Sequence, residues 1–188
     1  MNLFIDSIST PAYICLFDQD RKIISDLCIE VKWNESSKII PELTWFLENN
    51  DLEAHDLENT VVINGPWSFT WVRTTVLITN TLNYVIQKHM TAISYFDLFN
   101  NYPIIKSSSR RDHFVKKIQN WEVEIIENWK LEEFLNKNDI TAVFWETWYD
   151  FENIEILEKI DYTRIIQELE LKKDTKIEPL YIKKPNIS

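Results

Sequence analysis

The sequence predicts an α/β protein with a mixed sheet. Three observations lead to this prediction: apolar strand-like runs open the chain, amphipathic helical segments then alternate with short β-branched runs, and a shorter mixed half follows Pro103. With 188 residues, of which 45% are hydrophobic and 27% charged, the chain is long enough for one domain or two small lobes. We expect one lobe over residues 1–102 and a shortened lobe over residues 103–188.

The first half begins with an antiparallel meander. Residues 2–6 and 12–17 are apolar runs that a Ser/Thr cluster separates, and both are typical of strands. The polar residues 18–21 predict a tight turn, and a third strand follows over residues 22–31.

The hydrophobic period then changes to that of a helix. Apolar stripes predict helices over residues 34–50 and 69–88, the second with Ser68 or Thr70 as its N-cap. Between them, the β-branched run 60–63 is typical of a buried parallel strand.

The remainder mixes short strands and helices, and no internal repeat is evident from the residues. The expected strands are 91–94, 104–106, 113–118, 122–127 and 141–144, the expected helices are 95–100, 131–137 and 162–172, and residues 178–183 form an extended tail.

Charge, hydropathy and metal-binding residue types disfavour several functional classes. A net charge of −10 argues against direct nucleic-acid binding, because such proteins usually present a basic face. No apolar run approaches the roughly 20 residues of a membrane helix, and no signal peptide is evident, so we expect a cytoplasmic protein. Cys15 and Cys28 are expected to be reduced core residues. Because His55, His89 and His113 are isolated in the sequence, we expect no metal site.

The balance of glycine and tryptophan is unusual. The chain contains 1 glycine and 8 tryptophans, whereas ordinary usage would give roughly 13 glycines. Trp67, Trp121 and Trp129 occupy turn-like positions, where glycine is favoured and tryptophan is not. Either the protein is simply rich in tryptophan, or its source organism reads UGA as glycine while this sequence was translated with UGA as tryptophan. UGG codons at these three positions and at Trp71 would exclude the second explanation.

Three motifs of this sequence resemble motifs of the TsaB (YeaZ) family and follow one another in the same order. The opening 5–12, IDSISTPA, is similar to the family's IDTSTPA with one extra residue, and the tail 179–183, PLYIK, is similar to its Pro-x-Tyr-Leu-Arg ending. The loop 65–73, GPWSFTWVR, is similar to GPGSFTG-Leu/Val-Arg, and both small-to-large departures replace Gly by Trp. The family motif residues are Gly65, Pro66, Trp67, Ser68, Phe69, Thr70, Trp71 and Arg73.

The resemblance implies an actin/Hsp70-like fold of two ribonuclease-H-like lobes, the second reduced. It also implies a non-catalytic subunit that binds and supports the TsaD-type transferase, which forms N6-threonylcarbamoyladenosine in tRNA next to the anticodon. On this basis we expect a heterodimer with a TsaD homologue, contact with a TsaE homologue, tRNA and ATP only at the level of the complex, and self-association as another use of the same helices. The expected interface residues are Leu43, Leu47, Thr74, Leu77, Asn80, Thr81 and Tyr84.

Alternatives remain open at each of these positions. Leu77 and its neighbours could instead face the chain's own core, and the loop 65–73 is either a phosphate cradle or a plain connection. Asp6, Ser9 and Thr10 are candidate nucleotide contacts, or else they satisfy backbone groups in the hairpin turn. The alternative function is a small ATP-dependent phosphotransferase or ATPase of the actin-like fold.

Overall fold

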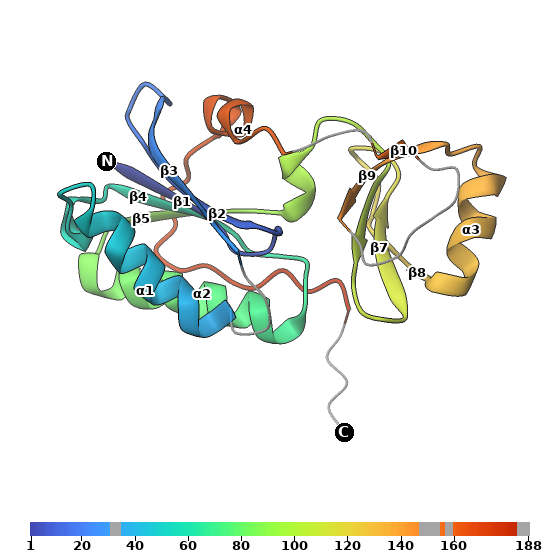
Figure 1. The fold of residues 1–188 in the computed structure, drawn as a ribbon, viewed down its shortest axis with the longest axis horizontal. Coiled ribbons are helices and arrows are strands. Elements are labelled where there is room, and N and C mark those ends of the chain that lie inside the picture. Colours follow the sequence, from blue (N-terminus) through green and yellow to red (C-terminus); the bar gives the residue numbers. More distant parts are fainter. Residues whose placement is uncertain (31–34, 147–154, 157–159, 184–188) are drawn as a thin grey trace. The chain divides into compact units, whose positions relative to one another are not determined.

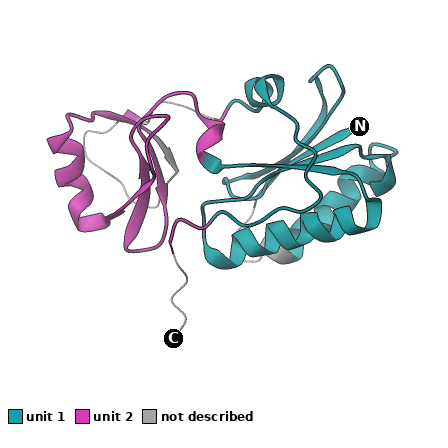
Figure 2. Ribbon diagram, turned by 180° about the vertical axis from the view of Figure 1, so that it is seen from behind, with its two compact units in different colours: residues 1–95, 161–180 teal, residues 96–160, 181–188 magenta. Residues whose placement is uncertain are grey.

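The computed structural model describes residues 1–30, 35–146, 155–156 and 160–183. The chain forms two compact units, one of residues 1–95 and 161–180 and the other of residues 96–160 and 181–188 (Figure 2). This division differs from the predicted lobes 1–102 and 103–188, because the segment 161–180 returns to the first unit. No helix among the described residues has the length and apolar character needed to cross a bilayer.

The first unit is built on a five-stranded mixed sheet with the order β3-β2-β1-β4-β5. Its strands are β1 (Asn2–Asp6), β2 (Ala12–Phe17), β3 (Ile23–Ile29), β4 (Asn59–Ile63) and β5 (His89–Ile93). The first three pair antiparallel, whereas β4 pairs with β1, and β5 with β4, in parallel. The predicted meander and the predicted parallel strand are therefore confirmed.

Two helices cover one face of this sheet (Figure 1). They are α1 (Glu35–Glu48) and α2 (Phe69–Ile86), close to their predicted bounds. The predicted N-cap of α2 is confirmed, since the Ser68 side chain accepts a hydrogen bond from the Trp71 N–H at 3.4 Å. The opposite face is covered by the short helix α4 (Tyr162–Glu168) (Figure 1). Two short 3₁₀ helices lie in the loops between these elements: η1 (Ala54–Asp56) has three residues and η2 (Tyr95–Leu98) has four.

The second unit repeats the topology of the first. Its strands are β6 (Ile104–Ser107), β7 (Asp112–Lys116), β8 (Glu124–Glu127), β9 (Ala142–Glu146) and β10 (Glu155–Ile156), in the order β10-β9-β6-β7-β8. As in the first unit, the first three strands pair antiparallel, whereas β9 pairs with β6, and β10 with β9, in parallel. Two ribonuclease-H-like sheets of this kind form the predicted actin/Hsp70-like fold. The described residues of this unit contain one α-helix, α3 (Asn128–Lys137), whereas those of the first unit contain three. The second unit is therefore the smaller of the two.

The described tryptophans do not require the backbone freedom of glycine. Among described residues, positive φ outside glycine occurs at Arg21, Asp51, Gln87 and Asp139. Trp129 is 73% exposed and Trp121 is 50% exposed, so these side chains add little to the core. The hypothesis that UGA encodes glycine in the source organism stays a prediction. The exposure of Trp121 and Trp129 is compatible with it, because replacing these side chains by glycine would remove little from the core.

Candidate functional site

Asp6 lies at the end of β1 and is completely buried. One carboxylate oxygen, Oδ1, accepts hydrogen bonds from the backbone N–H groups of Ile8 at 2.9 Å and Ser9 at 3.0 Å. The other, Oδ2, accepts one from the Tyr162 hydroxyl at 2.8 Å. These contacts support the alternative in which Asp6 satisfies backbone groups in the turn. Ser9 is also buried and Thr10 is exposed, and nucleotide contact at these residues stays a prediction.

Tyr162 closes the sheet face over Asp6. Its ring stacks on Tyr13 with centroids 3.8 Å apart and planes 9° apart, and meets Phe4 edge-on with centroids 5.8 Å apart. Helix α4 begins at this point because the Asp161 side chain accepts a hydrogen bond from the Arg164 N–H at 3.1 Å. The carboxylate of Asp6 is thus covered by an aromatic side chain of the same unit.

The buried carboxyl of Asp6 is expected to make stability pH-dependent. Burial raises the pKa of Asp6 above its usual value of 3.8. The folded chain then holds this proton more tightly than the unfolded chain, so the favourable contribution is complete below the unfolded-state pKa and is lost as the pH rises through the folded-state pKa. Relative to Asp6→Asn, the wild type should therefore lose stability as the pH rises through this window.

Urea unfolding at a series of pH values measures this difference. The control is Asp20→Asn, which removes an exposed carboxylate from the β2–β3 turn. A free-energy difference between wild type and Asp6→Asn that does not change with pH would contradict the expected titration.

The loop at residues 65–73 is held by the tail of the same unit. The Leu180 N–H donates to the Asn64 carbonyl at 2.8 Å, and the Tyr95 N–H donates to the Gly65 carbonyl at 2.7 Å. The Asn64 side chain donates to the Glu178 carbonyl at 2.9 Å. Two of the motifs quoted above, the loop and the tail, therefore meet in space, which supports the structural alternative for the loop.

Two asparagines of α2 bind the segment that directly precedes the tail. The Asn80 amide exchanges two hydrogen bonds of 2.9 Å with the N–H and carbonyl groups of Ile177. The Asn83 side chain donates to the Thr175 carbonyl at 3.2 Å. Because the Asn80 side chain is engaged within the chain, we do not include it in the interface proposed below.

An apolar groove of about 580 Å³ lies between α1 and α2. Several of its side chains are well exposed, among them Leu77 at 67% and Val85 at 73%. The residues that line it are Ile40, Leu43, Thr44, Leu47, Glu48, Leu52, Glu53, Ala54, Leu77, Ile78, Thr81, Leu82 and Val85. Its two charged residues are both glutamates, and the rest of the lining is apolar or carries a hydroxyl.

The groove brings together part of the predicted interface, namely Leu43, Leu47, Leu77 and Thr81. Thr74 and Tyr84 also lie on α2 but outside this lining. The alternative in which Leu77 faces the core is wrong, because the buried side of α2 is formed by Val72, Thr75, Val76, Thr79, Asn83 and Ile86. Sequence reasoning missed Ile78, Leu82 and Val85, whose spacing of three and four residues is the signal that could have found them.

Cysteine and histidine positions show no metal-binding arrangement in the described part of the chain, where no group of three or more His, Cys, Asp or Glu side chains is close enough to hold a metal ion. Both cysteines are free, and Cys15 is buried. The prediction that Cys28 is a core residue is wrong: it is exposed because β3 is an edge strand of the sheet. Burial lowers the pKa of His113, which lies beside the Ser107 hydroxyl at 3.3 Å.

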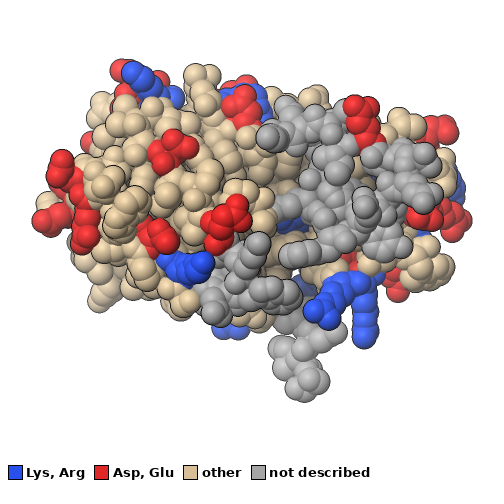
Figure 3. Space-filling view, in the orientation of Figure 1, with Lys and Arg blue, Asp and Glu red and all other residues tan. Residues whose placement is uncertain are grey.

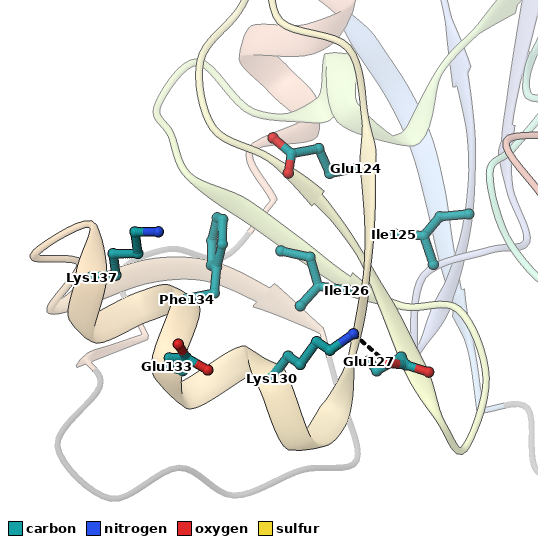
Figure 4. A pocket seen from close by; sticks show the side chains of 8 residues that line it. All are labelled: Glu124, Ile125, Ile126, Glu127, Lys130, Glu133, Phe134 and Lys137. Atoms are coloured by element: carbon teal, nitrogen blue, oxygen red, sulfur yellow. Dashed lines mark ion pairs between the residues drawn. The ribbon is translucent and has the colours of Figure 1, made fainter.

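A second hollow, of about 470 Å³, lies in the other unit between β8 and α3 (Figure 4). Ile126 and Phe134 form its apolar part and pack against the buried cluster of that unit. Its charges partly neutralise one another, because Lys130 pairs with Glu127 at 2.9 Å. This hollow therefore has neither a large apolar surface nor a lining of one charge, so we do not propose a ligand for it.

Comparisons with known proteins agree with the motifs. No family model matches the chain. Over 92 residues it is 30% identical to the tRNA threonylcarbamoyladenosine biosynthesis protein TsaB of Bacillus subtilis, a match covering 49% of this chain and 40% of that protein. The structure of YeaZ from Pseudomonas aeruginosa is similar with a TM-score of 0.51 and 14% identity, over 68% of this chain and 66% of that one.

A second structure shows the same fold. It is described as an uncharacterized protein with similarity to peptidase YeaZ from Pseudomonas aeruginosa, and it matches with a TM-score of 0.50 and 14% identity over 68% of this chain and 65% of that one. The chain thus spans less than half of the Bacillus protein and just under two thirds of the two YeaZ structures. The chain is thus similar in sequence to part of a TsaB protein, and it shares its fold with the two YeaZ structures.

Proposed function

We propose that this chain is an accessory subunit in the formation of N6-threonylcarbamoyladenosine next to the anticodon of tRNA. In this proposal it acts in the cytoplasm by binding a TsaD-type threonylcarbamoyltransferase through the groove between α1 and α2. The similarity to the Bacillus protein, which is named for tRNA threonylcarbamoyladenosine biosynthesis, supports the pathway. The observation that carries the mode of action is the exposed apolar groove itself.

Exposure of this groove is the physical reason to propose a protein partner. Leu77, Val85 and Ile40 are more than half exposed on two adjacent helices. A monomeric domain rarely leaves so much contiguous apolar surface in water, whereas burying it against another protein is favourable. Packing two helices against two helices would bury on the order of 1,600 Å² in total, the usual size of a specific interface.

A role without catalysis is part of the proposal. The carboxylate of Asp6 is occupied by two backbone N–H groups and the Tyr162 hydroxyl, so no contact of Asp6 favours the alternative phosphotransferase. A net charge of −10 favours tRNA contact through the complex rather than by this chain. In the same scheme ATP is used at the level of the complex, and a TsaE homologue is a further partner.

Leu77→Asp is expected to abolish binding of the TsaD homologue from the same organism, and with it tRNA modification. The new carboxylate would have to be buried in an apolar contact without a counter-ion, which is strongly unfavourable. Because Leu77 is 67% exposed in the free chain, the variant should fold normally. Co-purification and a tRNA modification assay, with circular dichroism as the check on folding, measure these effects.

The matched control is Ile24→Asp. This change places the same charge on an apolar side chain that is 51% exposed on the edge strand β3, outside the groove. Binding should survive in the control. A folded Leu77→Asp chain that binds and supports modification as the wild type does would show that the groove is not the interface.

A further inference from the structure

The groove has one end at which negative charge gathers. Both α1 and α2 end there: Leu52 and Ala54, which follow α1, line the same groove as Val85 in the last turn of α2. Figure 1 shows the two helices running side by side in the same direction. Neither helix has a basic residue in its last turn.

Two contributions make this end negative. The last carbonyl groups of each helix carry a partial charge of roughly half an elementary charge, so two helix ends add where they meet. Glu48 and Glu53 add full charges at the same place. Figure 3 shows acidic side chains gathered over the end of the first unit at which α1 ends.

Nearby cations do not remove this charge. Within the described residues, Glu48 has no ion-pair partner, and Glu53 is 80% exposed with His55 Nδ1 at 3.2 Å. Lys88 follows α2 by two residues but does not line the groove. An apolar partner helix that ended against Glu48 and Glu53 without a cation would therefore bury these acids at a cost.

We propose that the partner presents an apolar helix with a lysine or arginine at the end that meets Glu48 and Glu53. The inference rests on the proposed function and adds the chemistry by which the partner is recognised and oriented. It also disfavours a second copy of this chain as the occupant, because two copies that each carry a net charge of −10 repel one another.

The experiment reverses the charge at this end of the groove. The double variant Glu48→Lys, Glu53→Lys is titrated with the TsaD homologue at low and at high ionic strength, beside wild type and Glu42→Lys. We expect about tenfold weaker binding at low salt and a reduced salt dependence. Glu42→Lys changes the charge of the same helix outside the groove lining, and it should bind nearly as wild type.

Folding and binding should change in opposite directions in the double variant. A lysine at position 48 would favour the C-terminal end of α1, so thermal unfolding should shift slightly upward while partner binding weakens. Weaker binding therefore cannot be explained by a poorly folded chain.

The other outcomes overturn the inference. Unchanged affinity at both salt concentrations would exclude a cation on the partner at this place, whereas Leu77→Asp reports separately on the groove as the interface. A wild-type chain that forms dimers through the groove, with no loss of dimer in the double variant, would show that a second copy and not a basic helix is the occupant.

Discussion

Replacing Tyr162 with alanine is expected to lower the free energy of unfolding by about 2–4 kcal/mol. The change removes a ring that stacks on Tyr13 at 3.8 Å and meets Phe4 at 5.8 Å. It also leaves the Oδ2 atom of buried Asp6 without the hydroxyl that donates to it at 2.8 Å. Urea unfolding followed by circular dichroism measures the loss.

Tyr162→Phe separates the ring from the hydroxyl in the same experiment. We expect this variant to lose about 1–3 kcal/mol, because it leaves an oxygen of the buried Asp6 carboxyl without its hydrogen-bond donor. Combined with Asp6→Asn, its effect should be non-additive, since both changes act on one contact. If Tyr162→Phe is as stable as the wild type, the hydroxyl contributes nothing to holding α4 on the sheet.

The local elements of this fold could be predicted from the sequence because their signals are local. The apolar runs of β1 and β2 match the predicted ranges 2–6 and 12–17, and α2 begins at the predicted residue 69 after its Ser68 cap. Bounds fail mainly at element ends: β3 ends at Ile29 and not at residue 31, and α4 ends at Glu168 and not at residue 172. Short elements without periodicity, such as η1, carry no signal of this kind.

Contacts between distant segments could not be predicted in the same way. Tyr162 and Asp6 are 156 residues apart, and nothing in the sequence near either residue indicates that they meet. The repeated sheet topology is also invisible in the residues, because each sheet needs only apolar strands of suitable length. Leu77 is exposed in the groove, and its role in an interface stays a prediction. The hydrogen bond between the Asn80 side chain and Ile177, 97 residues away, could not be foreseen from the sequence.

Gly65→Ala is expected to destabilise the first unit by about 2–4 kcal/mol. Gly65 has a φ of +129°, a backbone conformation that residues with a Cβ atom rarely adopt. A Cβ atom here would lie 2.5 Å from the carbonyl oxygen of Leu180, so either the loop or the tail must move. Movement of the tail would strain the hydrogen bond of 2.8 Å between the Leu180 N–H and the Asn64 carbonyl. Thermal unfolding and limited proteolysis of the tail report on the two effects.

A shortened chain that ends at Pro179 separates backbone strain from the clash. The obstacle is the backbone oxygen of Leu180, so Leu180→Ala would not relieve it, whereas removal of the residue would. In the shortened chain Gly65→Ala should therefore cost clearly less than in the full chain, where both terms act. Equal losses in the two chains would assign the whole effect to the φ of residue 65. No loss in either would mean that the loop adopts another conformation and that Gly65 is not what allows the tail to dock.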